Sequence, residues 1–444
     1  MVTVVIIGAG SNFTLGLLGD FFRTGLEDAE LVLMDINEPR LKAVHRVVKT
    51  VIDRRGFNLK VKACVDLREA VDGADYVITT IRAGGVEALK SYVEIPLRHG
   101  AVHLVGDTTG PGGVLKALIE TPAIISIAEA VEDLSPGALI LNFTNPMTTI
   151  CTAVHIATKV EIIGLCHGVH HIASLTSKLL GISRKELEVL AAGLNHFTWT
   201  TGVFHCKENL LPQLRKELFS PDKREVVERH PYLIGRQLFN VFKIPPTLSD
   251  RHTAEFFHQL YSWISHPVYG PVLKRVSGYI DFEKKRLSDR AARRGEEWYA
   301  RIREVEEGRR GVSPSGEYAL DIVSARERGE TRLLLAANVP NKGLIEGLPD
   351  EVAVEVPVFV SKSGVHGIGV DLPSSVKALL NLHAVKYVLL ARGIVEKDLG
   401  LVEEALNLDP LTPSPEIGHR IMEEFLASWG RYLKQYGFKT GGCV

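Results

Sequence analysis

A cysteine and a histidine stand where a divalent metal could be bound. Cys166 follows an apolar run at residues 160–165 that is typical of a buried strand. Open α/β sheets place their ligands at the carboxyl ends of such strands. A thiolate is a good ligand for a divalent metal there, and His196 is the best second ligand in the chain. The alternative is structural, because free cysteines are among the most buried residues and often only fill space.

A glycine-rich turn near the start of the chain predicts a dinucleotide site. The β-branched run at residues 2–7 is followed by Gly8 and Gly10, and then by a helical stretch at residues 14–24. Gly8 permits a tight turn, and Gly10 lets the backbone approach a pyrophosphate at the amino terminus of the helix. Phe13 occupies the place of the third glycine in this fingerprint, so the turn alone is a weak signal.

The strand that follows strengthens the dinucleotide prediction. It ends in Asp35, roughly 25 residues beyond the glycines, where a carboxylate would accept the ribose hydroxyls. An acid there would repel a 2′-phosphate, so we expect NAD rather than NADP. The alternative is that Asp35 caps the helix that opens near residues 37–39.

Two further polar residues are candidates for substrate contacts. Arg82 follows the buried run at residues 76–81 and is either a solvated charge or an anchor for a sugar hydroxyl or carboxylate. Asn145 follows the strand expected to end at Asn142 and could bond a sugar. Its position before Pro146 is equally typical of a helix start.

Acidic residues in two turns are candidates for acid or base chemistry. Asp107 lies in the segment 106–113, where four glycines and a proline predict a loop before a helix that starts at Val114. Its carboxylate either supports an Asx turn or faces a substrate. Asp250 opens a helix after a proline turn, so it is either a cap or a catalytic group.

His252 and Glu255 lie three residues apart on one face of the helix that Asp250 opens. That spacing could hold a metal, but it more often makes a surface pair.

Strand–helix alternation to about residue 171 predicts an α/β fold with a Rossmann-like, doubly wound parallel sheet. Beyond it the chain is mostly helical and charged at residues 210–310, with returning antiparallel strands at 331–339 and 352–360. We therefore expect an NAD-binding domain at residues 1–195. A mixed α+β domain at residues 196–444 would complete the active site and carry the oligomer contacts.

The composition excludes several classes of function. The chain has 444 residues, 45% of them hydrophobic, and 52 basic against 53 acidic residues, so its charge gives no argument for nucleic acid or an anionic membrane. No run of about 18 apolar residues predicts a membrane span, and the first residues enter a strand without a signal-peptide pattern. Five cysteines without a C-x-x-C pair indicate a reducing compartment. We expect a cytoplasmic enzyme or binding protein.

Seven motifs in order resemble one enzyme family. They are GAGS at 8–11, RAGG at 82–85, GDTTGPGG at 106–113, NFTNP at 142–146, GLCHG at 164–168, GLNHFTW at 193–199 and NVPN at 338–341. Together they resemble glycoside hydrolase family 4, the NAD- and manganese-dependent glycosidases, from residue 4 to about 360.

The resemblance implies hydrolysis without the usual pair of carboxylates. NAD would take a hydride from C3 of the sugar, and the metal, bound to the C2 and C3 oxygens, would stabilise the enediolate left when a base removes the C2 proton. An acid would assist departure of the leaving group at C1, water would add, and the hydride would return.

The resemblance also implies roles for individual residues. Cys166 and His196 match the two protein ligands of Mn²⁺. Asp250 matches the base for the C2 proton, with Tyr261 a weaker stand-in. For the acid, Asp107 is the first candidate and His167 the second, since some relatives carry Asp or Asn after the cysteine. The cofactor-binding positions are Gly8, Gly10, Ser11, Asn12 and Asp35, and the substrate-binding positions are Arg82, Asn145, Asn195 and Arg251.

The Cys-His-Gly sequence at residues 166–168 looks like that of the α-glycosidases of unphosphorylated sugars, nearest to the α-glucuronidases. No added basic cluster for a 6-phosphate lies beside it. A uronate would need a cation near C6, which Arg82, Arg251 or His252 could supply. The expected partners are a small glycoside and further copies of the chain in a homodimer or homotetramer.

Two rival hypotheses remain at this point. The first is an NAD-dependent 2-hydroxy acid dehydrogenase, which would need no metal. The second is an NAD-sensing binding protein, in which Cys166 and His196 would be dispensable.

Overall fold

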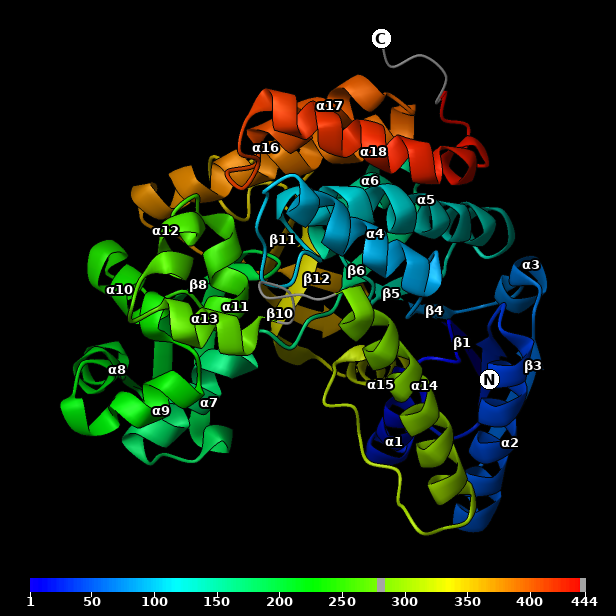
Figure 1. Ribbon diagram of the computed structural model, residues 1–444. Helices are drawn as coiled ribbons and strands as arrows, with labels where there is room; N and C mark the ends of the chain where they lie inside the picture. Colours follow the sequence, from blue (N-terminus) through cyan, green and yellow to red (C-terminus); the bar gives the residue numbers. More distant parts are fainter. Residues whose placement is uncertain (278–283, 440–444) are drawn as a thin grey trace.

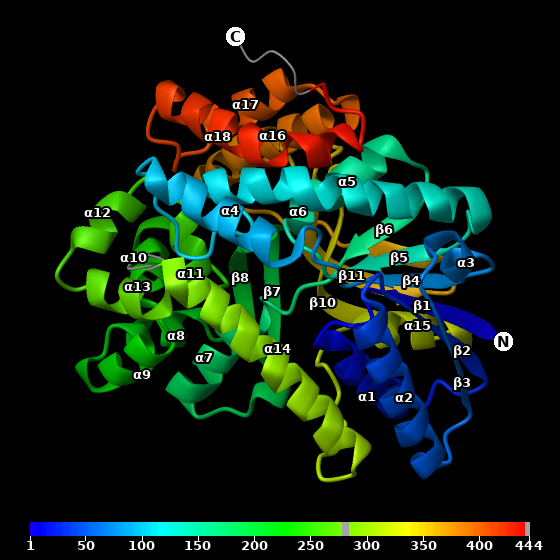
Figure 2. The same ribbon diagram turned by 45° about the vertical axis from the view of Figure 1, so that its right-hand side comes forward.

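The structure is a computed structural model that describes residues 1–277 and 284–439. One mixed sheet of twelve strands runs through the described residues, in the order β3-β2-β1-β4-β5-β6-β10-β11-β7-β8-β9, with β12 paired to β11 (Figures 1 and 2). The predicted α/β class with a parallel sheet and a second, mixed part is confirmed.

The first six strands form the parallel half of the sheet, and all except the third, an edge strand that carries two lysines, are short and mostly apolar. Their bounds are β1 Val2–Ile7, β2 Ala29–Met34, β3 Leu59–Cys64, β4 Tyr76–Thr79, β5 Leu139–Asn142 and β6 Glu161–Gly164. The strand order β3-β2-β1-β4-β5-β6 reverses direction at β1, which is the crevice where doubly wound sheets bind nucleotides.

Helices cover both faces of the parallel half. Val4 and Ile6 of β1 pack into one core and Val5 and Ile7 into the other, because alternate strand residues point to opposite faces. The first core lies under α1 (Phe13–Thr24) and α2 (Glu38–Arg55). The second lies under α3 (Leu67–Val71), α4 (Gly85–Arg98), α5 (Gly110–Leu134) and α6 (Met147–Ala157).

The antiparallel half continues the same sheet. Its strands are β7 Leu187–Leu194, β8 Phe197–His205, β9 Glu208–Asn209, β10 Arg332–Pro340, β11 Ala353–Ser361 and β12 Gly364–Gly367. Asn338 of β10 pairs with Gly164 of β6, which joins the two halves. The expected domain boundary at residues 195/196 falls in the turn of the β7–β8 hairpin, and β7 pairs with both β8 and β11.

Helices of the second half form two groups. A lobe beside β7 and β8 contains α7 His170–Leu180, α8 Leu211–Leu218, α9 Arg224–Arg229, α10 Leu233–Phe242, α11 Asp250–Thr253, α12 Leu260–Ser265 and α13 Gly270–Val276, with short 3-10 turns η1 Arg184–Glu186, η2 Pro221–Lys223 and η3 Ala254–Phe256. α14 (Lys284–Glu306) and α15 (Ala319–Arg328) return to the parallel half, where they contact α2 and α1 respectively.

The last three helices, α16 Ser374–Glu396, α17 Leu399–Leu408 and α18 Pro415–Lys434, form an outer layer over α4, α5 and α6 (Figure 1, orange to red). Among the described helices, α16 alone has the length and apolar composition to cross a membrane. More than half of that apolar stretch is buried, and the helix packs against α6 and α17, as expected for a core helix.

One local expectation was wrong. The segment 106–113 was predicted to be a loop, but α5 already begins at Gly110. Pro111 is favourable at the first helical turn. A Cβ at Gly112 would lie 2.8 Å from the carbonyl oxygen of Tyr92, and one at Gly113 would lie 2.7 Å from the backbone of Thr108. These glycines therefore permit close packing rather than a loop.

Candidate active site

Three side chains from distant parts of the chain form a group that could hold a metal ion. They are Asp107, His196 and His252, and their ligand atoms all lie within 4.8 Å of one another. A carboxylate and two imidazoles are common ligands of divalent transition metals. The donor set and its spacing therefore fit a divalent cation.

His196 lies in the tight turn between β7 and β8, between the paired residues Leu194 and Phe197. Its φ of 64° is uncommon for a residue other than glycine, and such backbone strain is concentrated at functional sites. Its Nδ1 lies 2.8 Å from the hydroxyl of Thr108, which leaves Nε2 for a metal. Metal-binding histidines are commonly oriented through their other nitrogen in this way.

His252 reaches the group from α11. Its ring centroid lies 4.3 Å from that of His196, and its buried Nδ1 has no hydrogen-bond partner. A buried nitrogen without a hydrogen-bond partner destabilises the fold unless a bound ligand or metal ion interacts with it. Burial lowers the pKa of His252 to about 3, and the neighbouring His196 contributes, so the ring is neutral near pH 7.

Asp107 is the anionic member of the group. Burial alone would raise its pKa, but Lys116 and the two histidines outweigh this effect and lower the pKa to about 2. A carboxyl group that stays ionised at neutral pH suits a ligand better than a proton donor. The geometry therefore does not favour Asp107 as the acid.

Glu255 fixes the segment that carries Asp107. It is 1% exposed, and its Oε1 accepts hydrogen bonds from the backbone N–H groups of Leu104, Val105 and Gly106 at 2.6, 2.8 and 3.1 Å. The expectation that His252 and Glu255 form a surface pair was wrong, because the interior packs around both residues and each has a different partner.

Cys166 lies directly after β6 and is not a member of the three-residue group among the described residues. Its thiol lies close to the side chain of Asn195, the neighbour of His196. The two expected metal ligands thus lie in one region. Burial raises the pKa of the Cys166 thiol, and the carboxylate of Glu355 contributes.

Asn195 is fully buried in the sheet rather than exposed to a substrate. Its Nδ2 donates to Glu355 Oε2 at 2.8 Å, and Asn338 Nδ2 donates to the same oxygen at 3.2 Å. Glu355 is itself 1% exposed, and burial raises its pKa to about 7. Asn195, Asn338 and Glu355 thus form a buried polar cluster in the sheet beside Cys166.

His167 combines an accessible ring with a buried partner. Its side chain is 69% exposed, while its Nδ1 lies 2.6 Å from Oε1 of Glu317, which is only 5% exposed. The hydrogen bond to Glu317 raises the pKa of His167. A histidine held in this way can present the other ring nitrogen to a substrate as a proton donor.

Asp250 is 1% exposed and binds the amino terminus of α10. Its two carboxylate oxygens accept from the backbone N–H groups of Ile234 at 3.0 Å and Gly235 at 2.8 Å. Burial raises its pKa to about 7, a value suited to a general base at neutral pH. Tyr261, the weaker stand-in, donates instead to the carbonyl of Leu411 at 2.8 Å.

Of the other expected substrate contacts, Arg251 lies nearest to the metal-binding group. Its charge acts on both His196 and His252, and its buried Nε has no hydrogen-bond partner. Arg82 is exposed after β4, near Glu120. Asn145 accepts a hydrogen bond from the backbone N–H of Met147 at 3.2 Å, as a residue at a helix start would.

The expected NAD residues meet at the carboxyl ends of β1 and β2. Asp35 Oδ2 accepts from the backbone N–H of Gly10 at 2.7 Å, and a Cβ at Gly10 would lie 2.8 Å from the same oxygen. Gly8 has a φ of 86°, and a Cβ there would lie 2.9 Å from the backbone of Thr80. The cap of α2 is Asn37, whose side chain accepts from the N–H of Arg40. The alternative role of Asp35 as that cap is therefore unnecessary.

The glycine turn continues into α1. The Ser11 hydroxyl lies 3.1 Å from that of Thr80, and Asn12 is the cap residue of α1, without a side-chain hydrogen bond to the helix. From α14, Trp298 and Arg301 line a small space together with Ser11 and Asn12. The second half of the chain thus covers the turn that would bind the dinucleotide phosphates.

Sequence reasoning missed Glu317 and Glu355 and misjudged Glu255. Glu355 did leave a signal, since it is the one charged residue in the apolar strand β11. A charge in a buried strand implies polar partners. No local pattern distinguishes Glu317 from an exposed glutamate.

Most of the sequence matches two models of one protein family. The model described as "Family 4 glycosyl hydrolase" matches residues 3–182, and that of the family's C-terminal domain matches residues 191–412. An α-galactosidase from Rhizobium meliloti is 29% identical, with 98% of this chain and 89% of that protein covered. An α-galacturonidase from Bacillus subtilis is 31% identical, with 79% and 80% covered.

Solved structures share the fold. A 6-phospho-α-glucosidase from gut microorganisms, in complex with NAD and Mn²⁺, has a TM-score of 0.79 at 22% identity, over 97% of this chain and 98% of that one. The malate dehydrogenase of Plasmodium falciparum has a TM-score of 0.52 at 12% identity, over 90% and 100%, a likeness of fold alone. Because the two family models span both halves of the sheet, the chain belongs to family 4 of the glycosyl hydrolases.

Proposed function

We propose that this enzyme hydrolyses the α-glycosidic bond of an unphosphorylated hexoside or hexuronide, with an α-glucuronide as the favoured substrate. The observation that carries the proposal is the group of Asp107, His196 and His252, which lies in one site with Cys166, His167 and Arg251. The similarity to enzymes described as α-galactosidase, α-glucosidase and α-galacturonidase supports an α-glycoside.

The proposed cofactors are NAD and Mn²⁺. When bound, they would supply a hydride acceptor and a Lewis acid, which together make the C2 proton of a sugar acidic. Gly8, Gly10 and Asp35 would hold the dinucleotide at the crevice of the parallel sheet. His196, with Cys166 as the partner that the family resemblance implies, would hold the metal.

We extend the proposed metal site by His252 and Asp107. Both have ligand atoms within 4.8 Å of those of His196, and the free Nδ1 of His252 lacks any other partner among the described side chains. The Thr108 hydroxyl would orient His196, and Glu255 would hold the backbone that presents Asp107.

The proton transfers are assigned to two side chains. Asp250 would accept the C2 proton, since its raised pKa lets it exchange a proton near pH 7. His167 would donate a proton to the leaving oxygen at C1, because its ring is accessible and its Nδ1 is held by Glu317. We prefer His167 to Asp107 because the latter stays ionised beside two imidazoles.

Arg251 is the proposed anchor for a uronate carboxylate. A buried guanidinium nitrogen without a partner favours an anionic ligand. Lys116 is the other nearby cation, but its charge already acts on Asp107 and Glu120. Arg82 is exposed at the edge of the sheet, so its guanidinium can be hydrated and does not need an anionic ligand.

The test is a panel of p-nitrophenyl α-glucoside, α-galactoside, α-glucuronide and α-galacturonide, assayed with NAD, Mn²⁺ and a thiol reductant. Turnover of an α-uronide that requires both cofactors, with solvent deuterium incorporated at C2 of the product, supports the proposal. Turnover that persists after removal of NAD and metal, or product without deuterium at C2, would refute the mechanism. A preference for a neutral sugar would refute only the uronide assignment.

A further inference from the structure

A loop from the second half of the chain lies directly on the dinucleotide-binding helix α1. A Cβ added at Gly19 would lie 2.5 Å from the backbone of Ser313, and one at Gly16 would lie 3.0 Å from Cβ of Ser315. Any larger residue at these two glycines would push the loop away. The loop that joins α14 to α15 is therefore held at a fixed distance from α1.

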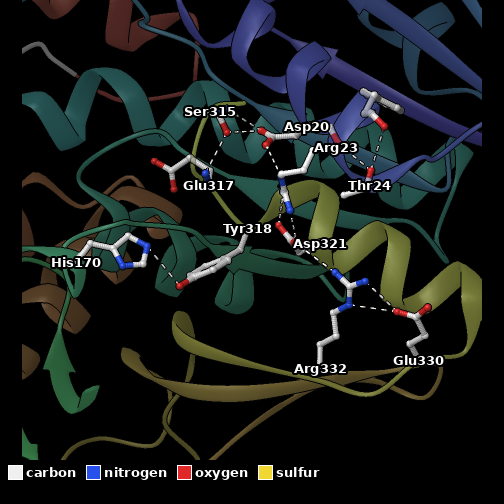
Figure 3. A network of polar contacts seen from close by, with 11 residues as sticks. Asp20, Arg23, Thr24, His170, Ser315, Glu317, Tyr318, Asp321, Glu330 and Arg332 are labelled. Atoms are coloured by element: carbon white, nitrogen blue, oxygen red, sulfur yellow. Dashed lines mark hydrogen bonds and ion pairs between the residues drawn. The ribbon is translucent and has the colours of Figure 1, made fainter. Parts of the chain in front are cut away.

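Hydrogen bonds run from this contact to the active site, and Figure 3 shows those from Asp20 through Ser315 to Glu317. Asp20 of α1 is fully buried, and its Oδ2 accepts from both the backbone N–H (3.2 Å) and the hydroxyl of Ser315. The Ser315 hydroxyl in turn accepts from the backbone N–H of Glu317 at 3.0 Å. Glu317 then holds Nδ1 of His167 at 2.6 Å. Three residues thus connect α1 to the ring beside Cys166.

The same loop holds the far end of the turn that carries His167. The Tyr318 hydroxyl lies 3.4 Å from Nε2 of His170, and the backbone N–H of His170 donates to the carbonyl of His167 at 3.0 Å. Both residues of the turn are therefore tied to neighbouring residues of one loop.

A second contact joins α1 to α15 without involving the hydrogen-bonded chain that reaches His167. Arg328 Nη2 donates to the backbone carbonyls of Thr24 and Gly25 at 2.6 and 2.9 Å. The ion pair of Arg23 with Asp321 is not separate in this way, because Arg23 Nε also donates to Asp20 Oδ1 at 3.2 Å (Figure 3). Arg328 therefore provides the control.

We propose that Asp20, Ser315 and Glu317 are positioning residues, which fix the His167 ring relative to the dinucleotide-binding helix. The inference rests on the proposed function, in which His167 protonates the leaving group while the sugar lies against the nicotinamide. Because the hydrogen-bonded chain starts on α1, one rigid unit sets both the place of the cofactor and the place of the proton donor.

Ser315→Ala is the sharpest test. It removes the hydroxyl that both Asp20 and Glu317 use, but it keeps the Cβ that packs on Gly16. We expect kcat for a methyl glycoside to fall about tenfold or more, and kcat for the p-nitrophenyl glycoside to fall less than about threefold, because a good leaving group needs little protonation. KM and the Kd for NAD should stay within about twofold of wild type.

Arg328→Gln is the matched control, because it weakens the α1–α15 contact without touching the hydrogen-bonded chain from Asp20 to His167. In this variant, kcat for both the methyl and the p-nitrophenyl glycoside should stay within about twofold of wild type. The proposal is overturned if Ser315→Ala turns over the methyl glycoside at the wild-type rate, if kcat falls equally for both leaving groups, or if Arg328→Gln shows the same selective loss. Equal melting temperatures of the variants check that each has folded.

A spectroscopic measurement separates this inference from the proposed function. In protein with ¹⁵N-labelled histidine, the Nδ1 signal of His167, assigned by its loss in His167→Gln, reports the bond to Glu317. Ser315→Ala should shift that signal and Arg328→Gln should not. If the wild type hydrolyses no glycoside, the proposed function fails whatever the spectra show. If it does hydrolyse one and the signal is unmoved, the positioning chain fails.

Discussion

The imidazole rings of His196 and His252 lie with their centroids 4.3 Å apart and their planes inclined at 41°. One comes from a hairpin turn in the sheet and the other from a short helix in the lobe beside it. Burial lowers the pKa of both rings, so both are neutral near pH 7. Neutral imidazole is the form that binds metals.

The first prediction concerns His252 as a metal ligand that the family resemblance did not supply. His252→Ala should weaken Mn²⁺ binding by about 10- to 100-fold, because it removes a donor from the group with Asp107 and His196. Free Mn²⁺ can be followed by electron paramagnetic resonance during titration. His258→Ala, at an exposed position nearby, should change nothing. Equal Mn²⁺ affinities for the two variants would mean that the His252 ring contributes packing but is not a metal ligand.

The second prediction separates two roles of Asp250. Asp250→Asn should lower kcat by about 100-fold or more if the carboxylate is the base, while the Kd for NAD stays near that of wild type. It should also destabilise the protein by about 1 kcal/mol, because an amide cannot accept from both Ile234 and Gly235.

Asp398→Ala, which removes the cap of another helix, is the control for that capping effect. Asp398 accepts from the N–H groups of Gly400 and Leu401 at the start of α17, far along the chain from the site. It should lose similar stability in urea unfolding and keep full turnover. Wild-type turnover by Asp250→Asn would show that this aspartate is only a cap.

The parallel half of the fold was predictable because its inner strands, such as β1, β4 and β5, are buried on both faces and are therefore short apolar runs. β7 (Leu187–Leu194) escaped prediction because its alanines and glycine are weak strand formers. It pairs along its whole length with β8 and meets β11 where Glu355 lies opposite Gly193. The contact with β11 is long-range and leaves no local trace in the sequence.

The site was predictable only as far as single motifs reach. Asp107 and His196 belong to recognisable motifs, but nothing local indicates that His252 meets them. Glu255 was misjudged because helical spacing describes a helix surface and not what packs on it. The start of α5 was misplaced because glycines favour both loops and close packing, and only the neighbouring backbone decides between them.

The third prediction assigns Arg301 to the dinucleotide site. Its Nε is buried without a hydrogen-bond partner and lines a small space with Ser11 and Asn12. Arg301→Gln should weaken NAD binding about tenfold, the effect of one charge-assisted hydrogen bond to a phosphate. Isothermal titration calorimetry without metal or substrate measures this directly. Arg303→Gln, exposed on the same helix, should bind NAD as wild type does. Equal affinities for the two variants would exclude Arg301 from the site.

The fourth prediction concerns a buried ion pair under the metal site. Lys386 Nζ lies 2.6 Å from Asp409 Oδ2, with side chains 1% and 0% exposed, and Asp409 also accepts from the N–H of Gly110 at 2.9 Å. Lys386→Met would leave a buried carboxylate without its cation and should cost roughly 3–5 kcal/mol of unfolding free energy. Arg98→Met, at an exposed pair with Glu424, should cost less than about 1 kcal/mol. Similar losses in the two variants would contradict the buried-pair argument.

The last prediction is a pH dependence of stability. Glu120 of α5 is 1% exposed, and burial raises its pKa from 4.5 to about 7, although Lys116 and the N–H of Ala83 oppose the shift. A carboxyl group whose pKa is higher in the folded state binds its proton more tightly there than in the unfolded chain. Glu120 therefore does not lower the free energy of unfolding below pH 4.5. As the pH rises toward 7, its ionisation lowers the free energy of unfolding, by about 3 kcal/mol at most.

Glu120→Gln keeps an oxygen for the N–H of Ala83 and cannot ionise. Its stability relative to wild type should therefore increase between pH 5 and pH 8 and then level off, as followed by urea unfolding at each pH. Glu129→Gln, exposed on the same helix, should show no such increase. A flat difference for Glu120→Gln would mean that Lys116 keeps the Glu120 carboxylate ionised throughout, so that the two side chains act as a buried ion pair beside Asp107.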